Sequence, residues 1–235
     1  MSPLVKCCLN GARPFEEHPA LPRSAADAAR EAAAAVAAGA GAIHVHPRDA
    51  PGAESLDASV IAEWVGAIHD ACPGVPVGVS TGWWIVPDLQ IRLAQIAQWR
   101  EPLPDFASVN LNEEGAPEVA RACLQRGVGI EAGLATAADV EPLIAAGLNG
   151  SWLRLLVEVD ELTEVTRLDA ALDETELSAP RLYHGFDAGT WPVIGEALER
   201  DRDVRVGLED TLVLPDGSAP RGNAELVAAA VALVA

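Results

Sequence analysis

Two histidines and two carboxylates carry the chemistry that this sequence suggests most directly. His44 and His46 flank Val45 at the end of a short apolar run. Because side chains alternate across a strand, both imidazoles point to the same side. Glu209 and Asp210 follow another apolar run late in the chain. Two imidazoles and one carboxylate make the ligand set of a catalytic zinc site, which keeps one position open. A carbonyl or carboxylate oxygen bound there would be polarised by the metal.

Each of these residues also has a structural interpretation. Two histidines on a buried strand can be held by backbone carbonyls, and neighbouring carboxylates can cap a turn. Glu131 can lie at the surface if its predicted strand is shifted by one position. His184 can make a hydrogen bond that only stabilises the fold, and the sequence leaves open what His184 and Glu158 do.

Eight repeats of a strand followed by a helix must position these residues. Short apolar or β-branched runs predict strands at residues 4–9, 42–46, 77–80, 106–110, 129–132, 152–157, 181–183 and 204–207. The stretches between them predict helices at residues 24–38, 56–69, 87–98, 116–126, 136–146, 163–177, 190–199 and 223–234. A (β/α)8 barrel usually needs about 250 residues, and this chain has 235. The sequence therefore predicts an α/β TIM barrel, with residues 1–235 as a single domain.

An open doubly wound sheet is the alternative architecture. It usually carries a glycine fingerprint after its first strand, and residues 10–13 read Asn-Gly-Ala-Arg instead. Signals at helix ends agree with the predicted element order. Ser24 is placed to cap the first helix, and Gly39, Gly127 and Gly147 stand where helices should end.

The charge balance argues against several classes of partner. The 35 acidic residues against 16 basic ones give a net charge of −19, a surface that repels phosphate backbones and anionic lipid. No apolar run approaches the roughly 20 residues of a membrane helix, and the first residues do not read as a signal peptide. The four cysteines show no CxxC spacing, which indicates a reducing compartment. We therefore expect a cytoplasmic protein that binds neither nucleic acid nor membranes.

A single lysine bears on how a carbonyl could be activated. Lysine is the side chain that forms Schiff bases, and Lys6 is the only lysine in the chain. It lies near the start of the first predicted strand, whereas a barrel builds its active site at the carboxyl ends of the strands. Imine chemistry is therefore disfavoured, which leaves activation of the carbonyl to a metal.

Polar residues gather at the predicted carboxyl ends of the strands. In chain order they are Ser80, Thr81, Ser108, Asn110, Glu131, Glu158, His184, Arg205, Glu209 and Asp210. Hydroxyl and amide donors at Ser80, Thr81 and Asn110 suit the stabilisation of developing oxyanions. Arg205 is placed to orient Asp210 and to favour its charged form.

At these positions the sequence resembles the β-keto acid cleavage enzyme family. The similarity covers nearly the whole chain and rests on Asn10-Gly11-Ala12, His18-Pro19, Leu21-Pro22, Ala38-Gly39-Ala40, His44-Val45-His46-Pro47-Arg48-Asp49, Ser80-Thr81-Gly82, Ser108-Val109-Asn110, Glu131, Arg205-Val206-Gly207-Leu208-Glu209-Asp210 and Asn223. The HxHxRD and RxGxED motifs are its specific part. The chain ends soon after the last predicted helix, so we expect a short member of the family.

The resemblance implies a zinc-dependent barrel that exchanges acyl groups between a β-keto acid and acetyl-CoA, giving acetoacetate and a new CoA thioester. The family's site residues correspond to metal ligands His44, His46 and Glu209, an acid/base dyad of Asp210 and Arg205 with Asp210 as the base, substrate contacts Ser80 and Ser108, and an active-site glutamate at Glu131. Two histidines and a carboxylate also suit iron, cobalt or manganese. Because relatives assemble, we expect a homo-oligomer.

Arg13 departs from the family pattern. The best-known member has a glutamate at this position, which suits a substrate amine. An arginine suits a carboxylate or another anion, so we expect Arg13 to bind substrate and the substrate to be an acidic or uncharged β-keto acid. We also expect the segment Trp83-Trp84-Ile85 to narrow the mouth of the barrel.

Two other functions stay open at this point. One keeps the metal and omits CoA, as a lyase or hydrolase that acts on a small keto acid. The other is a non-catalytic barrel that binds a metal or a small anion.

Overall fold

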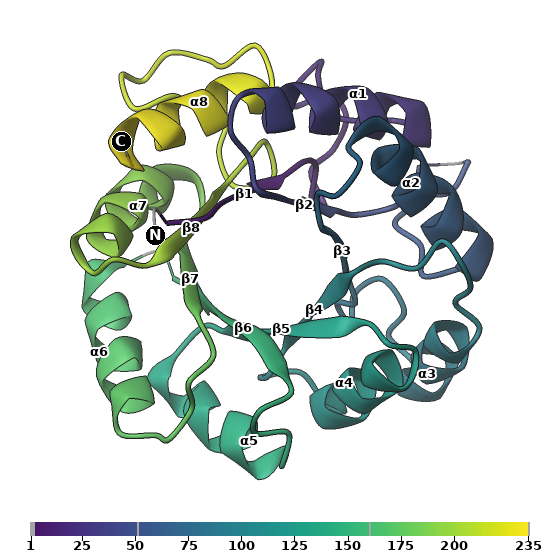
Figure 1. Ribbon diagram of the computed structural model, residues 1–235, viewed down its shortest axis with the longest axis vertical. Coiled ribbons are helices and arrows are strands. Elements are labelled where there is room, and N and C mark those ends of the chain that lie inside the picture. Colours follow the sequence, from purple (N-terminus) through teal and green to yellow (C-terminus); the bar gives the residue numbers. More distant parts are fainter. Residues whose placement is uncertain (1–2, 51, 160, 235) are drawn as a thin grey trace.

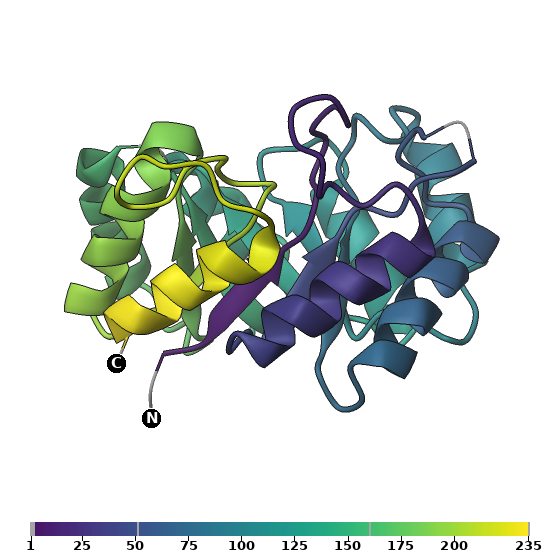
Figure 2. The ribbon, with the colours of Figure 1, turned by 90° about the horizontal axis from the view of Figure 1, so that it is seen from above.

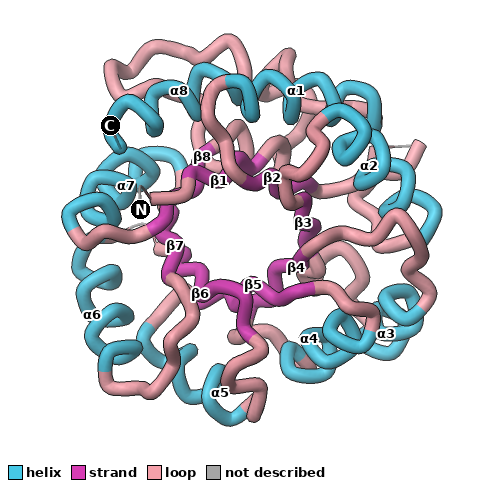
Figure 3. The backbone as a smooth tube through the Cα atoms, viewed as in Figure 1, coloured by secondary structure: helices cyan, strands magenta, loops and turns pink. Residues whose placement is uncertain are grey.

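A closed barrel of eight parallel strands forms the centre of the protein (Figure 1). The computed structural model describes residues 3–50, 52–159 and 161–234. Each strand pairs with its neighbours in chain order, and β8 returns to pair with β1. Helices form an outer ring around the strands (Figure 3). The predicted single-domain (β/α)8 barrel is therefore confirmed.

The elements alternate along the chain. The strands are β1 Val5–Cys8, β2 Ala42–Val45, β3 Val77–Ser80, β4 Phe106–Asn110, β5 Gly129–Leu134, β6 Trp152–Glu158, β7 Arg181–His184 and β8 Asp203–Val206. The α-helices are α1 Ala25–Ala37, α2 Ala58–Ala71, α3 Leu89–Ala97, α4 Ala116–Gln125, α5 Val140–Ala145, α6 Leu162–Asp173, α7 Thr190–Glu199 and α8 Asn223–Val234. Two 3-10 turns, η1 Ala137–Asp139 and η2 Asp187–Gly189, precede α5 and α7.

Local sequence signals explain where several helices begin and end. The Ser24 hydroxyl accepts a hydrogen bond from the backbone of Asp27 at 3.2 Å and so caps α1. The predicted helix ends at Gly39, Gly127 and Gly147 are confirmed by positive φ angles of 111°, 81° and 66°. An L side chain rarely adopts this conformation, whereas glycine does so freely.

Two predicted helices differ more than the others from the observed ones. The helix predicted at 136–146 begins with η1, which the Thr136–Asp139 capping box starts, and continues directly as the short helix α5. The helix predicted at 163–177 stops at Asp173 because the Thr175 hydroxyl donates to the carbonyl of Leu172 at 2.7 Å. Such a local side-chain bond competes with helix continuation.

The long loops that build the mouth gather on one side of the barrel. Figure 2 shows the segment after β1 rising on this side, whereas β1 begins and α8 ends on the opposite side. In the described ranges no helix is long and apolar enough to cross a lipid bilayer.

The barrel interior contains charged side chains near the amino ends of the strands. Lys6 donates to Glu131 at 2.5 Å, and both side chains are fully buried. The other Glu131 oxygen accepts from Arg154, whose Nε lies 3.6 Å from Asp203. We call Lys6, Glu131, Arg154 and Asp203 the lower ion cluster. Its two cations and two anions balance, which lowers the cost of burying them.

Candidate metal centre and active site

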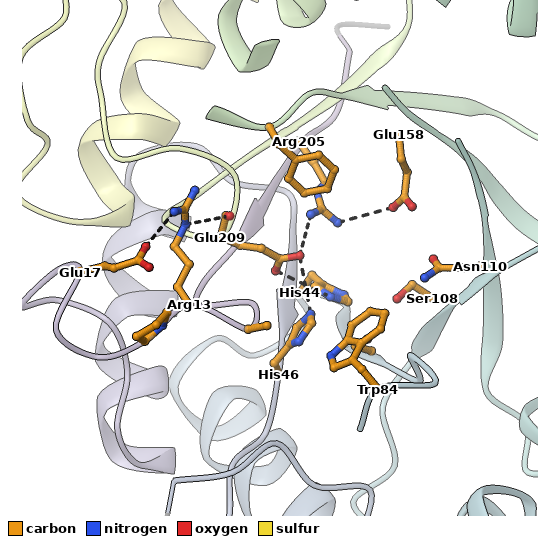
Figure 4. A pocket seen from close by; sticks show the side chains of 14 residues that line it. Arg13, Glu17, His44, His46, Trp84, Ser108, Asn110, Glu158, Arg205 and Glu209 are labelled. Atoms are coloured by element: carbon orange, nitrogen blue, oxygen red, sulfur yellow. Dashed lines mark hydrogen bonds and ion pairs between the residues drawn. The ribbon is translucent and has the colours of Figure 1, made fainter. Parts of the chain in front are cut away.

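A cavity of about 490 Å³ opens at the carboxyl ends of the strands. Its wall includes the three predicted metal ligands, His44, His46 and Glu209, and also Arg205. Loops after β1, β3 and β7 complete the wall, as Figure 4 illustrates for Arg13 and Trp84. The strand ends predicted to converge on one site therefore meet around one cavity.

The predicted ligands come together with the geometry of a candidate metal site. One ligand atom from each of His44, His46 and Glu209 can be chosen so that all lie within 4.8 Å of one another. The Nε2 atoms of His46 and His44 lie 3.6 and 3.9 Å from the two Glu209 oxygens. The opposite ring nitrogen of His46 is 2.5 Å from Glu54 Oε1. A carboxylate partner of this kind orients a ligating imidazole toward the metal, so these residues fit a divalent cation.

The electrostatics of the ligands are strongly perturbed. Burial lowers the pKa of His44 well below its usual value. Burial also acts to lower the pKa of His46, but the Glu209 and Glu54 carboxylates raise it to about 9. Burial acts to raise the pKa of Glu209, yet Arg205 and the two imidazoles hold it well below its usual range. The site therefore keeps an ionised carboxylate beside two histidines of unequal basicity.

Arg205 connects the ligand Glu209 to the predicted base Asp210. Its Nη2 donates to Glu209 Oε1 and to Asp210 Oδ1, both at 2.6 Å, and its Nε donates to Asp210 at 3.1 Å. Burial raises the pKa of Asp210, although the Arg205 charge opposes the shift. Asp210 is fully buried, and among the described residues its Oδ2 has no hydrogen-bond partner. The predicted dyad is thus in direct contact, and one free carboxylate oxygen is left to accept a proton.

Four residues that belong to the family-like sequence motifs position the loops that carry the predicted metal ligands and the Arg205–Asp210 dyad. Asn10 bonds both the carbonyl and the backbone nitrogen of His46, at 2.8 and 2.9 Å. A Cβ on Gly11 would lie 2.4 Å from Glu209 Cγ, so glycine leaves room for that ligand. Arg48 donates to the carbonyl of Gly11 at 2.8 Å, and Asn223 accepts from the backbone after β8 at 2.9 Å.

The predicted substrate residues divide into two groups. Ser80, Ser108 and Asn110 line the cavity. Thr81 does not, because its hydroxyl donates to the backbone carbonyl of Ser108 at 2.7 Å. The amide of Asn110 donates to Glu113 at 2.8 Å, a contact that the sequence did not suggest.

Glu131 lies away from the predicted ligands. It does not line the cavity, and both of its oxygens are occupied by Lys6 and Arg154 in the lower ion cluster. The structure places it in the barrel interior and not at the surface. Its predicted part in catalysis stays a prediction.

Arg13 lines the cavity but its guanidinium is already engaged. It donates to Glu17 at 2.9 Å, to Asp187 at 2.5 Å and to the backbone carbonyl of Glu209 at 3.1 Å. Its predicted role in binding an anion assumed an unpaired cation. With two carboxylates on one guanidinium, Arg13 contributes no unpaired positive charge to this part of the wall.

Several residues at the site could not be identified from their positions in the sequence. Trp84 lines the cavity and stacks on His46, with ring centroids 6.4 Å apart, and it donates to Glu54 at 3.1 Å. Of the tryptophan segment expected at the mouth, Trp84 therefore forms part of the cavity wall. Trp83 instead lines a second cavity beside α3.

His184 and Glu158 form a pair beside the predicted base. His184 Nε2 is hydrogen-bonded to Glu158 Oε1 at 2.9 Å, and its Nδ1 lies 3.8 Å from Asp210 Oδ1. Glu158 lines the cavity, whereas His184 is fully buried. The only sequence signal for this pair was the position of both residues at strand ends.

Comparison with known proteins identifies similar sequences over nearly the whole chain. A family model described as beta-keto acid cleavage enzyme matches residues 3–147 and 156–235. A 3-keto-5-aminohexanoate cleavage enzyme from Fusobacterium nucleatum subsp. nucleatum is 26% identical over 255 residues, which cover 98% of this chain and 90% of the relative.

Solved structures share the barrel at low sequence identity. A type I 3-dehydroquinate dehydratase from Clostridium difficile superposes with a TM-score of 0.67 at 11% identity, covering 99% of this chain and 92% of that one. The tryptophan synthase alpha subunit from Legionella pneumophila gives 0.62 at 15% identity, with the same coverage. At such identities these likenesses establish the fold alone.

Proposed function

Because the chain belongs to the beta-keto acid cleavage enzyme family, we propose that it exchanges acyl groups between a β-keto acid and acetyl-CoA with the help of a bound zinc ion. The CH2COO unit of the keto acid passes to the acetyl group and forms acetoacetate. The remaining acyl group passes to CoA and forms a new thioester. Atoms balance without an oxidant, a reductant or water.

One observation carries this proposal. The metal-ligand cluster and a buried carboxylate with one free oxygen are joined by a single guanidinium, that of Arg205. A divalent cation held by His44, His46 and Glu209 would act as a Lewis acid toward the keto and carboxylate oxygens of the substrate. Zinc fits this ligand set, and iron, cobalt or manganese would also fit it.

The chain's own residues then supply acid–base chemistry. Asp210 removes a proton from the carbon between the two carbonyl groups, and its raised pKa brings it closer to that of a useful base. Arg205 keeps Asp210 in place. The resulting carbanion attacks the thioester of acetyl-CoA, and the CoA thiolate leaves. The thiolate then attacks the original ketone, and the bond between that carbonyl carbon and the newly acetylated carbon breaks. Asp210 returns its proton to the acetoacetate carbanion, which completes the cycle. Ser80 and Ser108, which line the cavity, are available to bind the substrate oxygens.

An acyl-exchange assay tests the proposal. Purified protein loaded with zinc is given a panel of β-keto acids with and without acetyl-CoA, and new CoA thioesters are measured. We expect turnover that requires acetyl-CoA. Keto acid consumption at the same rate without acetyl-CoA would instead support a lyase or hydrolase, and no turnover would favour a binding protein. A cytoplasmic location and self-association remain predictions that fractionation and light scattering can check.

A further inference from the structure

The loop after β8 carries two groups whose relative position matters for the proposed chemistry. Glu209, a predicted metal ligand, and Asp210, the proposed base, are neighbours in the chain. Both side chains accept a hydrogen bond from Arg205 at 2.6 Å. Side chains that share one guanidinium keep their geometry only if the backbone beneath them is also fixed. The contacts of their two backbone carbonyls therefore show what holds this loop in place.

Arg13 donates to both of these carbonyls. Its Nε lies 3.1 Å from the carbonyl oxygen of Glu209, and its Nη2 lies 3.4 Å from that of Asp210. The same guanidinium donates to Glu17 at 2.9 Å and to Asp187 at 2.5 Å, and Figure 4 shows it between Glu17 and Glu209. A planar guanidinium can bond several acceptors at once in a fixed geometry. One side chain thus connects the loop after β1 with the loops after β7 and β8.

Asp187 holds the β8 loop from the other side. Its backbone nitrogen donates to the Asp210 carbonyl at 2.6 Å, and the Thr190 hydroxyl donates to the same oxygen at 3.3 Å. Asp187 has a φ of 44°, a conformation that costs energy in a residue other than glycine and persists where the surroundings fix it. The carbonyl of the proposed base therefore receives donors from Arg13, Asp187 and Thr190.

The backbone of Arg13 is anchored to the loop that carries another predicted metal ligand. Arg48 lies two residues after His46. Its Nη2 donates to the carbonyls of Arg13 and Gly11 at 2.9 and 2.8 Å. The loop of His46 thus holds the main chain of Arg13, while the side chain of Arg13 holds the main chain of Glu209. Arg13 stands between the ligands contributed after β2 and after β8.

The ion pair with Asp187 is not by itself the reason for an arginine at this position. The Asp187 side chain is 72% exposed, whereas that of Arg13 is 17% exposed, and an ion pair with such a solvated partner contributes little. Hydrogen bonds from a charged donor are stronger than those between neutral groups. The bonds to the two carbonyls therefore matter most, and Asp187 and Glu17 orient the guanidinium that makes them.

We propose that Arg13 is a positioning residue, which fixes the backbone of Glu209 and Asp210 and so keeps the metal ligand and the base in their relative places. The inference rests on the proposed function for the roles of these two residues. It assigns to Arg13 a task other than binding the substrate. An acidic acyl chain would then gain no affinity from this arginine.

Hydrogen exchange of the metal-free protein tests the inference without any measurement of activity. Mass spectrometry follows peptides that cover residues 207–212, in which the amides of Asp210 and Thr211 donate to the carbonyl of Gly207 at 2.9 and 3.0 Å. We expect these amides to exchange about tenfold faster in Arg13→Met, because hydrogen bonds from a charged donor no longer hold the loop. Circular dichroism checks that the variant is folded.

Three further variants serve as matched comparisons. Arg23→Met removes an exposed arginine of the same loop that packs on the Phe15 ring, and hydrogen exchange at 207–212 should stay at the wild-type rate. Arg13→Lys keeps the charge without the planar guanidinium, so its rate should lie within about threefold of that of Arg13→Met. Asp187→Asn leaves Arg13 on the two carbonyls and should raise the rate only about threefold.

Kinetics of acyl exchange separate positioning from substrate binding. With 3-oxohexanedioate, a keto acid with an acidic acyl chain, Arg13→Met should lower kcat about tenfold and leave KM within about threefold of wild type. A residue that binds the acyl carboxylate equally in the ground state and the transition state would instead raise KM and leave kcat unchanged.

Three results would overturn the inference. They are a wild-type rate of hydrogen exchange at 207–212 in Arg13→Met, an equally large increase in Arg23→Met, and a rise in KM with unchanged kcat. Failure of the proposed function is a separate result. The wild-type protein can lack acyl exchange while hydrogen exchange at 207–212 still depends on Arg13.

Discussion

The barrel interior holds two layers of charge that differ in how completely their atoms are paired. In the lower ion cluster both oxygens of Glu131 have a cationic partner, and both oxygens of Asp203 have a partner, one of them the backbone nitrogen of Leu4. Arg154 Nε has its 3.6 Å ion contact with Asp203 but no hydrogen bond. At the mouth, among the residues that the structure describes, Glu209 Oε2, Asp210 Oδ2 and His44 Nδ1 are buried without a hydrogen bond.

The difference separates a structural cluster from a binding site. Buried polar atoms are normally paired, so an unpaired set in a native protein needs a reason. The lower cluster satisfies its own charges and so requires no ligand. At the mouth, Glu209 and His44 line the cavity and keep unpaired atoms, which is the arrangement expected where a cation or a substrate completes the pairing.

The largest effect should come from Asp210, the mouth carboxylate with a free oxygen. Asp210→Asn keeps the size of the side chain but removes its basicity, and general-base catalysis contributes about a hundredfold to ten-thousandfold. We expect kcat for acyl exchange to fall by about a thousandfold while zinc content, measured by elemental analysis, stays at the wild-type level. Asp216→Asn, at an exposed turn, is the matched control. Activity within threefold of wild type in D210N would contradict the assignment of the base.

A substitution in the lower ion cluster should lower the stability of the fold and leave metal binding unchanged. Lys6→Met leaves Glu131 buried with one of its two cations missing. Removing one partner of a buried ion pair costs about 3 kcal/mol or more, so denaturant unfolding should show a loss of this size. Zinc affinity should change by less than threefold. Loss of zinc with no loss of stability would mean that the two layers are not separate.

Glu54 tests how the mouth holds its metal. Glu54→Gln weakens the partner of the His46 ring, and loss of such a partner typically lowers metal affinity about 10- to 100-fold. A competition assay with a zinc chelator measures this. Glu63→Gln, on the exposed face of α2, should have no effect. An unchanged affinity in the Glu54 variant would argue that the imidazole needs no anchor.

Thr81 should give the smallest effect. Its hydroxyl donates to the Ser108 backbone and does not face the cavity. Thr81→Val should therefore cost about 1 kcal/mol of stability and change KM for the keto acid by less than threefold. A larger rise in KM would contradict this expectation and support the predicted contact between Thr81 and the substrate.

The sequence carried most of the fold and the placement of the metal ligands. His44 and His46 could be placed together because alternation along a strand fixes their common side. Glu209 could be added because barrel topology brings the end of β8 near β2. Both arguments need only the alternation of side chains along a strand and the order of the strands in the barrel.

Contacts between loops could not be predicted in the same way. Arg13 reads as a free cation in the sequence, and its partner Asp187 lies 174 residues away. Glu54 reaches His46 through a loop whose path no periodicity describes. Glu131 lies within its predicted strand, but its partners Lys6 and Arg154 depend on side-chain packing across the barrel interior.

The lower ion cluster also bears on how substrates and products enter and leave the cavity. Its side chains Lys6 and Glu131 are fully buried and form a floor beneath the cavity, which opens at the strand carboxyl ends. Under the proposed reaction, the keto acid, acetyl-CoA and both products would then all use the opening at the strand carboxyl ends. A product must therefore leave before the next substrate binds. If the CoA thioester dissociates slowly, its release would limit the rate of turnover.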